Sequence, residues 1–95
     1  MSNQIVVVGH LRVAADDRDA YVADCLEVVR RARAAPGCLD FVVAADPLEP
    51  DRVAVVERWA SRADLDEFRG SGPPDELGAR IRDVRVVELD VPQHV

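Results

Sequence analysis

The chain has 95 residues, enough for one domain with a single modest core. Its formal net charge of −6 argues against nucleic acid as a partner, because nucleic acid binding needs a basic patch. All 12 basic residues are arginine, so lysine chemistry such as a Schiff base is excluded. The apolar run at residues 5–8 is far too short to cross a membrane, and we expect a cytoplasmic protein with no membrane partner.

Hydrophobic periodicity and turn residues predict seven elements. Val and Ile dominate the predicted strands, and a turn rich in proline and acidic residues joins two of them into a hairpin. A flexible loop is expected at residues 70–74, with a short disordered start at 1–4 and a tail at 92–95. In chain order the elements are a strand over 4–14, a helix over 16–35, strands over 38–45 and 52–59, a helix over 62–69, a helical piece over 75–81 and a strand over 84–91.

Glycine and aspartate predict several local conformations. Gly9 lacks a side chain in the middle of the first strand, which suits a bulge or the close approach of a ligand or another backbone. Asp16 and Asp17 offer side-chain oxygens that cap the start of the long helix. Gly37 follows Pro36 at the helix end, where a left-handed conformation is expected.

The stretch over residues 52–65 carries the strongest local signal. Its β-branched run ends at Trp59, the only tryptophan of the chain. Ser61 stands three residues ahead of Asp64, a spacing that predicts a helix N-cap with a capping-box partner. A large aromatic residue at a strand's end, beside the start of a helix, is suited to form the wall of a pocket.

The element order is β-α-β-β-α-β, the split βαβ pattern of the ferredoxin-like fold. We therefore predict one α+β sandwich domain over residues 1–95. The strands are apolar on both faces, but the helices can bury only one of them. Because an apolar sheet face of that size does not stay exposed on a monomer, we predict a homodimer in which a second sheet covers it.

Metal and cofactor chemistry find little support in the sequence. Cys25 and Cys38 have neither CxxC spacing nor histidine-rich surroundings, so both are expected to be reduced, partly buried thiols. The two histidines, His10 and His94, are far apart in the chain. We expect no metal and no cofactor.

The helix end, the hairpin and the second helix resemble the central signature of the antibiotic biosynthesis monooxygenase superfamily of dimeric α+β barrels. In that signature a helix ends in an ALPGC-like turn, a hairpin follows, and its second strand finishes ERW-x-S before a short helix. The resemblance covers residues 31–68, RARAAPGCLDFVVAADPLEPDRVAVVERWASRADLDEF. The matching positions are Pro36, Gly37, Cys38, Glu57, Arg58, Trp59 and Ser61.

The resemblance implies a homodimer in which each subunit keeps a cavity between its sheet and its helices. Members of the superfamily include oxygenases that convert phenolic or anthrone substrates to quinones without a metal or flavin, related quinol oxygenases, and haem-degrading enzymes. Other members have no established reaction. Trp59 corresponds to a family tryptophan that lines the cavity in several members.

Two departures from the superfamily pattern affect the expected chemistry. Many members carry a histidine in the second helix, where this chain has Phe68 followed by Gly72, Pro73 and Pro74. Haem-degrading members also rely on an asparagine late in the first strand, where this chain reads Gly-His-Leu at residues 9–11. We therefore do not expect haem degradation.

Five residues form the predicted site. Trp59, with Phe41 and Phe68, is expected to bind a planar aromatic substrate. Trp59 could equally be a core residue, and the burial tendency of Phe41 favours the core. His10 is the candidate for taking a phenolic proton, and Arg58 for stabilising an anion. Both also suit structural pairing at an edge or an interface.

Two further residues are expected to have structural roles. Glu57 shares the strand face of Trp59, and we expect a structural ion pair there, because a carboxylate on an apolar face either pairs with arginine or has a raised pKa. Tyr21 is expected to belong to the core.

The leading functional hypothesis is a cofactor-independent oxygenase that oxidises an electron-rich aromatic molecule, a phenol, anthrone or quinol, to a quinone. Deprotonation gives an anion that can pass an electron directly to O2. The alternatives are a non-catalytic small-molecule binding or stress-response protein on the same fold, and an isomerase or cyclase that uses the cavity for acid–base work.

Overall fold

The computed structural model describes residues 3–70 and 75–92. Within these residues the chain forms four strands and four helices. The expected loop at 70–74 and the expected ends at 1–4 and 92–95 lie mostly outside them, although Gln4 already pairs in the sheet. In chain order the elements are β1 (Gln4–Arg12), α1 (Arg18–Asp24), α2 (Leu26–Ala34), β2 (Cys38–Ala45), β3 (Arg52–Trp59), α3 (Arg62–Gly70), α4 (Asp75–Ala79) and β4 (Asp83–Val91).

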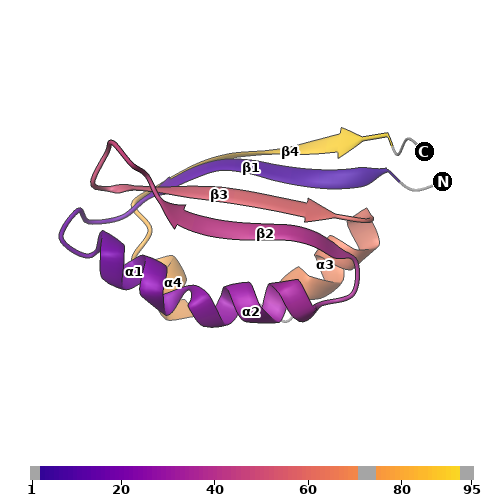
Figure 1. Cartoon of the computed structure of the whole chain (residues 1–95), viewed down its shortest axis with the longest axis horizontal. Helices are drawn as coiled ribbons and strands as arrows, with labels where there is room; N and C mark the ends of the chain where they lie inside the picture. The colour runs from indigo at the N-terminus through magenta and orange to yellow at the C-terminus, as the bar shows by residue number, and fades with distance from the viewer. Residues whose placement is uncertain (1–2, 71–74, 93–95) are drawn as a thin grey trace.

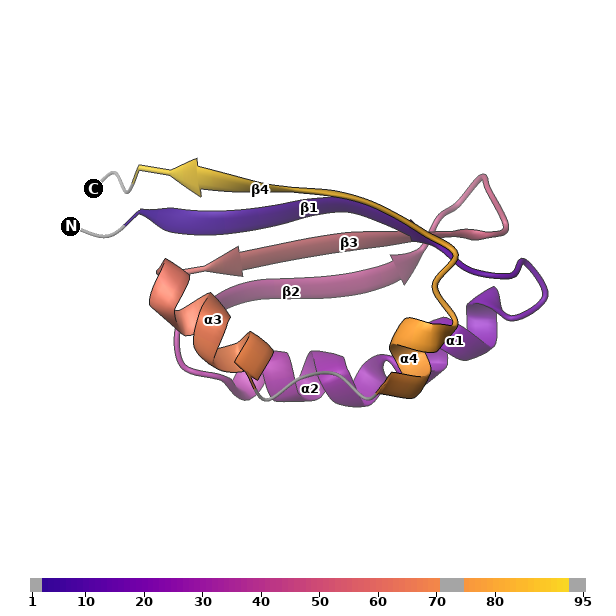
Figure 2. The same ribbon diagram turned by 180° about the vertical axis from the view of Figure 1, so that it is seen from behind.

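The strands form one antiparallel sheet in the order β2-β3-β1-β4. Figures 1 and 2 show that the described helices all lie on one side of this sheet. The arrangement confirms the predicted α+β ferredoxin-like fold. No helix among the described residues is long and apolar enough to cross a membrane.

The predicted helix over residues 16–35 is divided at Cys25 into α1 and α2. Cys25 keeps helical angles of φ −74° and ψ −12°, so the chain bends there without leaving the helical region. Its N–H is shared between the carbonyl oxygens of Tyr21 and Val22, at 3.0 and 3.2 Å. This shared bond tightens the turn and brings the side chains of both helices over the same sheet face.

The predicted side-chain cap of this helix is wrong. Asp17 occupies the N-cap position but makes no capping hydrogen bond with its side chain. Its two carboxylate oxygens instead accept from Nε and Nη2 of Arg80, each at 2.9 Å. A bidentate, charge-assisted ion pair is stronger than a capping hydrogen bond to a backbone N–H. The Asp17 carboxylate therefore links α1 to the segment after α4.

The turns around α3 have the predicted geometry. Gly37 has a φ of +81°, the left-handed conformation expected after α2. Ser61 Oγ accepts from the backbone N–H of Asp64 at 3.2 Å and donates to its carboxylate at 2.8 Å. A Cβ atom on Gly37 would run into the Asp64 side chain, so the end of α2 and the start of α3 are packed in direct contact.

Gly9 explains how closely β1 and β4 approach. Its φ is +154°, and a Cβ atom built on it would collide with the backbone carbonyl of Arg85. Of the alternatives predicted from the sequence, the close approach of another backbone is therefore the one that the fold uses.

The buried core between the sheet and the helices consists of two clusters. The first surrounds Trp59, near the N-terminal end of β1, and the second surrounds Tyr21, near the other end of the sheet. The first contains Ile5, Val7, Val29, Ala32, Phe41, Trp59 and Leu65, and the second contains Val13, Tyr21, Cys25, Val53 and Leu77.

The sheet face that points away from the helices, which we call the outer face, is apolar and exposed. Val42, Val56, Val87 and Leu89 are 40%, 39%, 55% and 48% exposed, respectively. They come from β2, β3 and β4, so the apolar surface extends across the sheet. The outer face is the surface on which the prediction of a homodimer depends.

Candidate functional site

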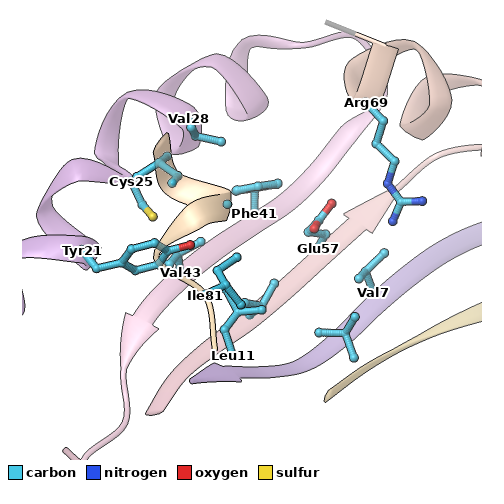
Figure 3. Close-up of a pocket in the computed structure, with 14 residues that line it drawn as sticks. Val7, Leu11, Tyr21, Cys25, Val28, Phe41, Val43, Glu57, Arg69 and Ile81 are labelled. Atoms are coloured by element: carbon cyan, nitrogen blue, oxygen red, sulfur yellow. The ribbon is translucent and has the colours of Figure 1, made fainter. Parts of the chain in front are cut away.

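A cavity of about 230 Å3 lies between the inner face of the sheet and the helices. It takes part of its wall from each of the two core clusters. Figure 3 shows its side chains converging from the sheet and from the helices above it. The lining residues are Val7, Leu11, Phe41, Val43, Val55, Glu57 and Val86 of the sheet, and Tyr21, Cys25, Val28, Arg69, Leu77, Gly78 and Ile81 of the helices and the segment after α4.

Glu57 places a carboxylate in this largely apolar cavity. Strand alternation puts its side chain on the same face of β3 as Val55 and Trp59, toward the helices. The indole Nε1–H of Trp59 donates a hydrogen bond of 3.0 Å to Glu57 Oε1. One carboxylate oxygen is thus held by a buried ring, which fixes the orientation of the group.

The pKa of Glu57 is raised above its ordinary value, chiefly because burial disfavours the charged carboxylate. The hydrogen bond from Trp59 and the charge of Arg69 act in the opposite direction, while the charge of Glu88 adds to the rise. The result is a carboxyl group whose proton affinity is closer to that of a general base working near neutral pH.

Arg69 brings a positive charge to the same end of the cavity. It lies in the last turn of α3, and its guanidinium points toward Glu57 (Figure 3). Its Nη2 pairs with Glu88 of β4 at 2.9 Å, and Arg62 pairs with the other oxygen of Glu88 at 2.7 Å. Glu88 therefore joins α3 to the edge strand and holds Arg69 beside the cavity, where its side chain is 44% exposed.

Tyr21 and Cys25 line the cavity from α1 and from the bend after it. They are 3% and 6% exposed. Burial raises the pKa of both the phenol and the thiol, so each is neutral at physiological pH. The guanidinium of Arg80 lies 5.2 Å from the centre of the Tyr21 ring, which anchors the ring from behind.

The three aromatic residues predicted to bind substrate come together as one cluster. Trp59 is 0% exposed, and its ring stacks on that of Phe68 at 5.2 Å with an interplanar angle of 30°. Phe68 in turn meets the edge of Phe41 at 5.8 Å. Of the three, Phe41 lines the cavity, while Phe68 occupies the ring face that Trp59 was expected to offer a substrate.

The two residues predicted to be catalytic lie on the outer face, away from the cavity. His10 follows Gly9 in β1 and is opposite Ala54 of β3 in the sheet register. Arg58 Nε donates to Asp40 at 2.9 Å, across the neighbouring strand. Because the sheet separates both side chains from the cavity, neither can reach a molecule bound there.

Sequence reasoning gave Glu57 and Tyr21 structural roles and did not single out Arg69. The sequence does contain a pattern that indicates Glu57: it is two residues from Trp59, on a strand face that is otherwise apolar. The position of Arg69 depends on Glu88 and therefore has no local signal. Together the three residues supply a carboxyl group, a cation and a neutral hydroxyl around an apolar cavity. Among the described residues, no group of three or more histidine, cysteine or acidic side chains could hold a metal ion.

The fold and the cavity define a ferredoxin-like α+β domain with an acid–base group facing an apolar pocket. Residues 4–76 match the model of the antibiotic biosynthesis monooxygenase family. The chain belongs to this family, and membership supports a monooxygenase-like role in general terms.

Solved structures share the fold over almost the whole chain. A proposed antibiotic biosynthesis monooxygenase from Chloroflexus aurantiacus is 28% identical, with 97% of each chain covered and a TM-score of 0.74. A second one, from Caulobacter crescentus, is 21% identical, with 97% of this chain and 92% of that chain covered and a TM-score of 0.82. An uncharacterized Synechocystis protein is 31% identical over 62 residues, which are 65% of this chain and 42% of that protein. The match thus spans less than half the length of the curated relative.

Proposed function

We propose that this protein is a cofactor-independent monooxygenase that oxidises an electron-rich aromatic molecule to a quinone. The observation that carries the proposal is Glu57, a carboxylate of raised pKa that is held by Trp59 at the wall of an apolar cavity. A phenol or anthrone must lose a proton before it can react with O2, and a base of this kind is suited to remove it.

The reaction converts the ring C–H and O–H groups of a phenol, or the CH2 group of an anthrone, together with O2 into quinone C=O groups and water. Glu57 takes the first proton and leaves a delocalised anion. The anion passes one electron to O2, and the two radicals combine to form the C–O bond of a peroxide. The remaining C–H proton passes to the outer peroxide oxygen as the O–O bond breaks, which gives the quinone carbonyl and hydroxide, and the hydroxide takes the proton held by Glu57. One oxygen atom of O2 ends in the quinone and the other in water.

Arg69 would stabilise the anion, because its guanidinium carries a charge to the end of the cavity where Glu57 removes the proton. The apolar lining would exclude water, which strengthens this attraction and protects the reactive intermediates. Phe41 would contact the flat face of the substrate, and Trp59 would act by orienting Glu57. In this proposal no cofactor takes part.

Oxygen uptake tests this function. The panel consists of anthrones, naphthols and hydroquinones, and the variants are Glu57→Gln and Glu67→Gln. Removing the base should reduce substrate-dependent uptake by roughly 10²- to 10⁴-fold. Glu67→Gln makes the same chemical change at an exposed position of α3 and should keep the wild-type rate. Absence of uptake with every substrate, or equal rates for the two variants, would refute the proposal.

We also propose that two copies pair through the outer face. Four branched aliphatic side chains there are each at least 39% exposed, and a two-fold axis would place this surface against itself. Val87→Asp should raise the dimer dissociation constant at least tenfold in sedimentation velocity. Leu48→Asp, at a hairpin position that is 90% exposed, should leave it unchanged. A wild-type monomer at micromolar concentration would contradict the pairing.

A non-catalytic binding protein on the same fold is the second candidate. The observation that favours it is the closed aromatic cluster, in which Phe68 covers the ring of Trp59. This function is supported if the aromatic panel binds saturably while no oxygen is consumed.

A further inference from the structure

The cavity has polar groups at two ends. Glu57 and Arg69 lie at one end, and the Tyr21 hydroxyl points into the cavity from the other side (Figure 3). Tyr21 packs in the same buried cluster as Val53 of β3. Glu57 is four residues further along that strand, a backbone distance of about 13 Å at the usual strand rise. Phe41, Val43 and other apolar side chains line the space between them.

The two ends differ in charge. Glu57 and Arg69 are suited to an oxygen that loses a proton. Tyr21 is almost fully buried, and it is a neutral hydroxyl that can donate to or accept from another neutral oxygen. Its hydrogen-bonding neighbour is the Cys25 thiol, which is a weak partner that a ligand oxygen can readily replace.

The volume of the cavity limits the size of the ligand. About 230 Å3 exceeds the engineered cavities of about 150 Å3 that accept a benzene ring. It is smaller than the pockets of about 300–1,000 Å3 that hold drug-sized ligands. One ring or two fused rings therefore fit, and a three-ring anthrone does not fit without rearrangement of the lining.

We propose that the cavity selects a one- or two-ring aromatic molecule with an oxygen at each end, and that Tyr21 is the specificity-determining residue that reads the far oxygen. Glu57 and Arg69 bind the ionisable hydroxyl, while Tyr21 hydrogen-bonds the second oxygen. A ligand without that oxygen leaves the buried Tyr21 hydroxyl without a strong partner, and is disfavoured for this reason. This inference names the substrate class of the site proposed above and rests on that site, but it concerns binding and not turnover.

The test compares two probes under anaerobic conditions, 2-naphthol and 2,6-dihydroxynaphthalene, by titration calorimetry. The dihydroxy compound presents the same groups in either orientation and differs from 2-naphthol only by the second hydroxyl. The wild type should bind it about three- to tenfold more tightly, the range that one neutral hydrogen bond supplies. Tyr21→Phe should abolish this preference. Val28→Ala, which changes only apolar lining, should alter both affinities and keep their ratio.

A second measurement does not depend on any variant. The chain has one tyrosine, so protein labelled with ¹³C at tyrosine Cζ gives one resonance. That resonance should move with 2,6-dihydroxynaphthalene and stay near its free position with 2-naphthol. Equal affinities of the two probes for the wild type, or equal shifts of the resonance, would overturn the inference even if oxygen uptake is observed. The expected preference without any oxygen uptake would support the inference and refute the oxygenase.

Discussion

Replacing Glu57 with glutamine should stabilise the folded protein at pH 8 while it removes the proposed catalytic base. Glutamine has nearly the same shape, and its Oε1 can still accept the hydrogen bond from Trp59. What disappears is the cost of keeping a carboxylate charged in a largely apolar cavity, which is the main cause of its raised pKa.

The size of the effect follows from the titration of one group. The folded protein binds the Glu57 proton more tightly than the unfolded chain, so the wild type loses stability as pH rises from the ordinary pKa of 4.5 to the raised pKa of the folded state. In that window the stability gap between Glu57→Gln and wild type should widen by up to about 1.4 kcal/mol per pH unit. Below and above the window the gap should be constant, and the difference between these two plateau values reports the pKa shift.

Urea unfolding between pH 4 and pH 9 measures this gap, with the fluorescence of the only tryptophan as the signal. All proteins are compared at one protomer concentration, because pairing of subunits also contributes to stability. Other carboxylates, such as Asp17 and Asp46, have lowered pKa values and weaken the fold in acid, but they do so equally in both proteins. Glu67→Gln should show no pH-dependent gap. A Glu57→Gln protein that is less stable than wild type at pH 8 would refute the account of Glu57.

Two further predictions concern the packing around the start of α3. Gly37→Ala should destabilise the protein by at least about 1 kcal/mol, because alanine is strained at a φ of +81° and its methyl group would collide with Asp64. The control is Gly70→Ala, whose added methyl group has no neighbour within 4 Å. This variant should be neutral or stabilising by up to about 1 kcal/mol. Ser61→Ala should cost about 1 kcal/mol through loss of the N-cap, and Ser61→Asp should recover part of that loss in the same urea assay.

The parts of the fold that depend on neighbouring residues were predictable from the sequence. The predicted strands over residues 38–45 and 52–59 coincide with β2 and β3, because alternation of period two is bounded on both sides by turn residues. The N-cap at Ser61 and the left-handed Gly37 were predicted for the same reason. Each of these features is decided by side chains within four residues along the chain.

Features that depend on distant residues were missed. The cap expected at Asp17 fails because Arg80, 63 residues away, takes both carboxylate oxygens. The division of the helix at Cys25 has no proline or glycine nearby to indicate it. Arg69 reaches the cavity because Glu88 holds it on the edge strand, a pairing that no local pattern indicates.

The structure gives Trp59 a position different from the one expected for a substrate platform. Trp59 was expected to form a platform for the substrate, and it is instead a fully buried ring whose face is covered by Phe68. A buried indole N–H needs an acceptor, and on a strand the nearest candidates on the same face are two residues away. Glu57 occupies such a position and accepts the bond. The Glu-x-Trp spacing therefore works as a unit in which the tryptophan orients the carboxylate. Because Oε1 is held by the indole, the proposed reaction assigns proton transfer to the remaining oxygen, Oε2.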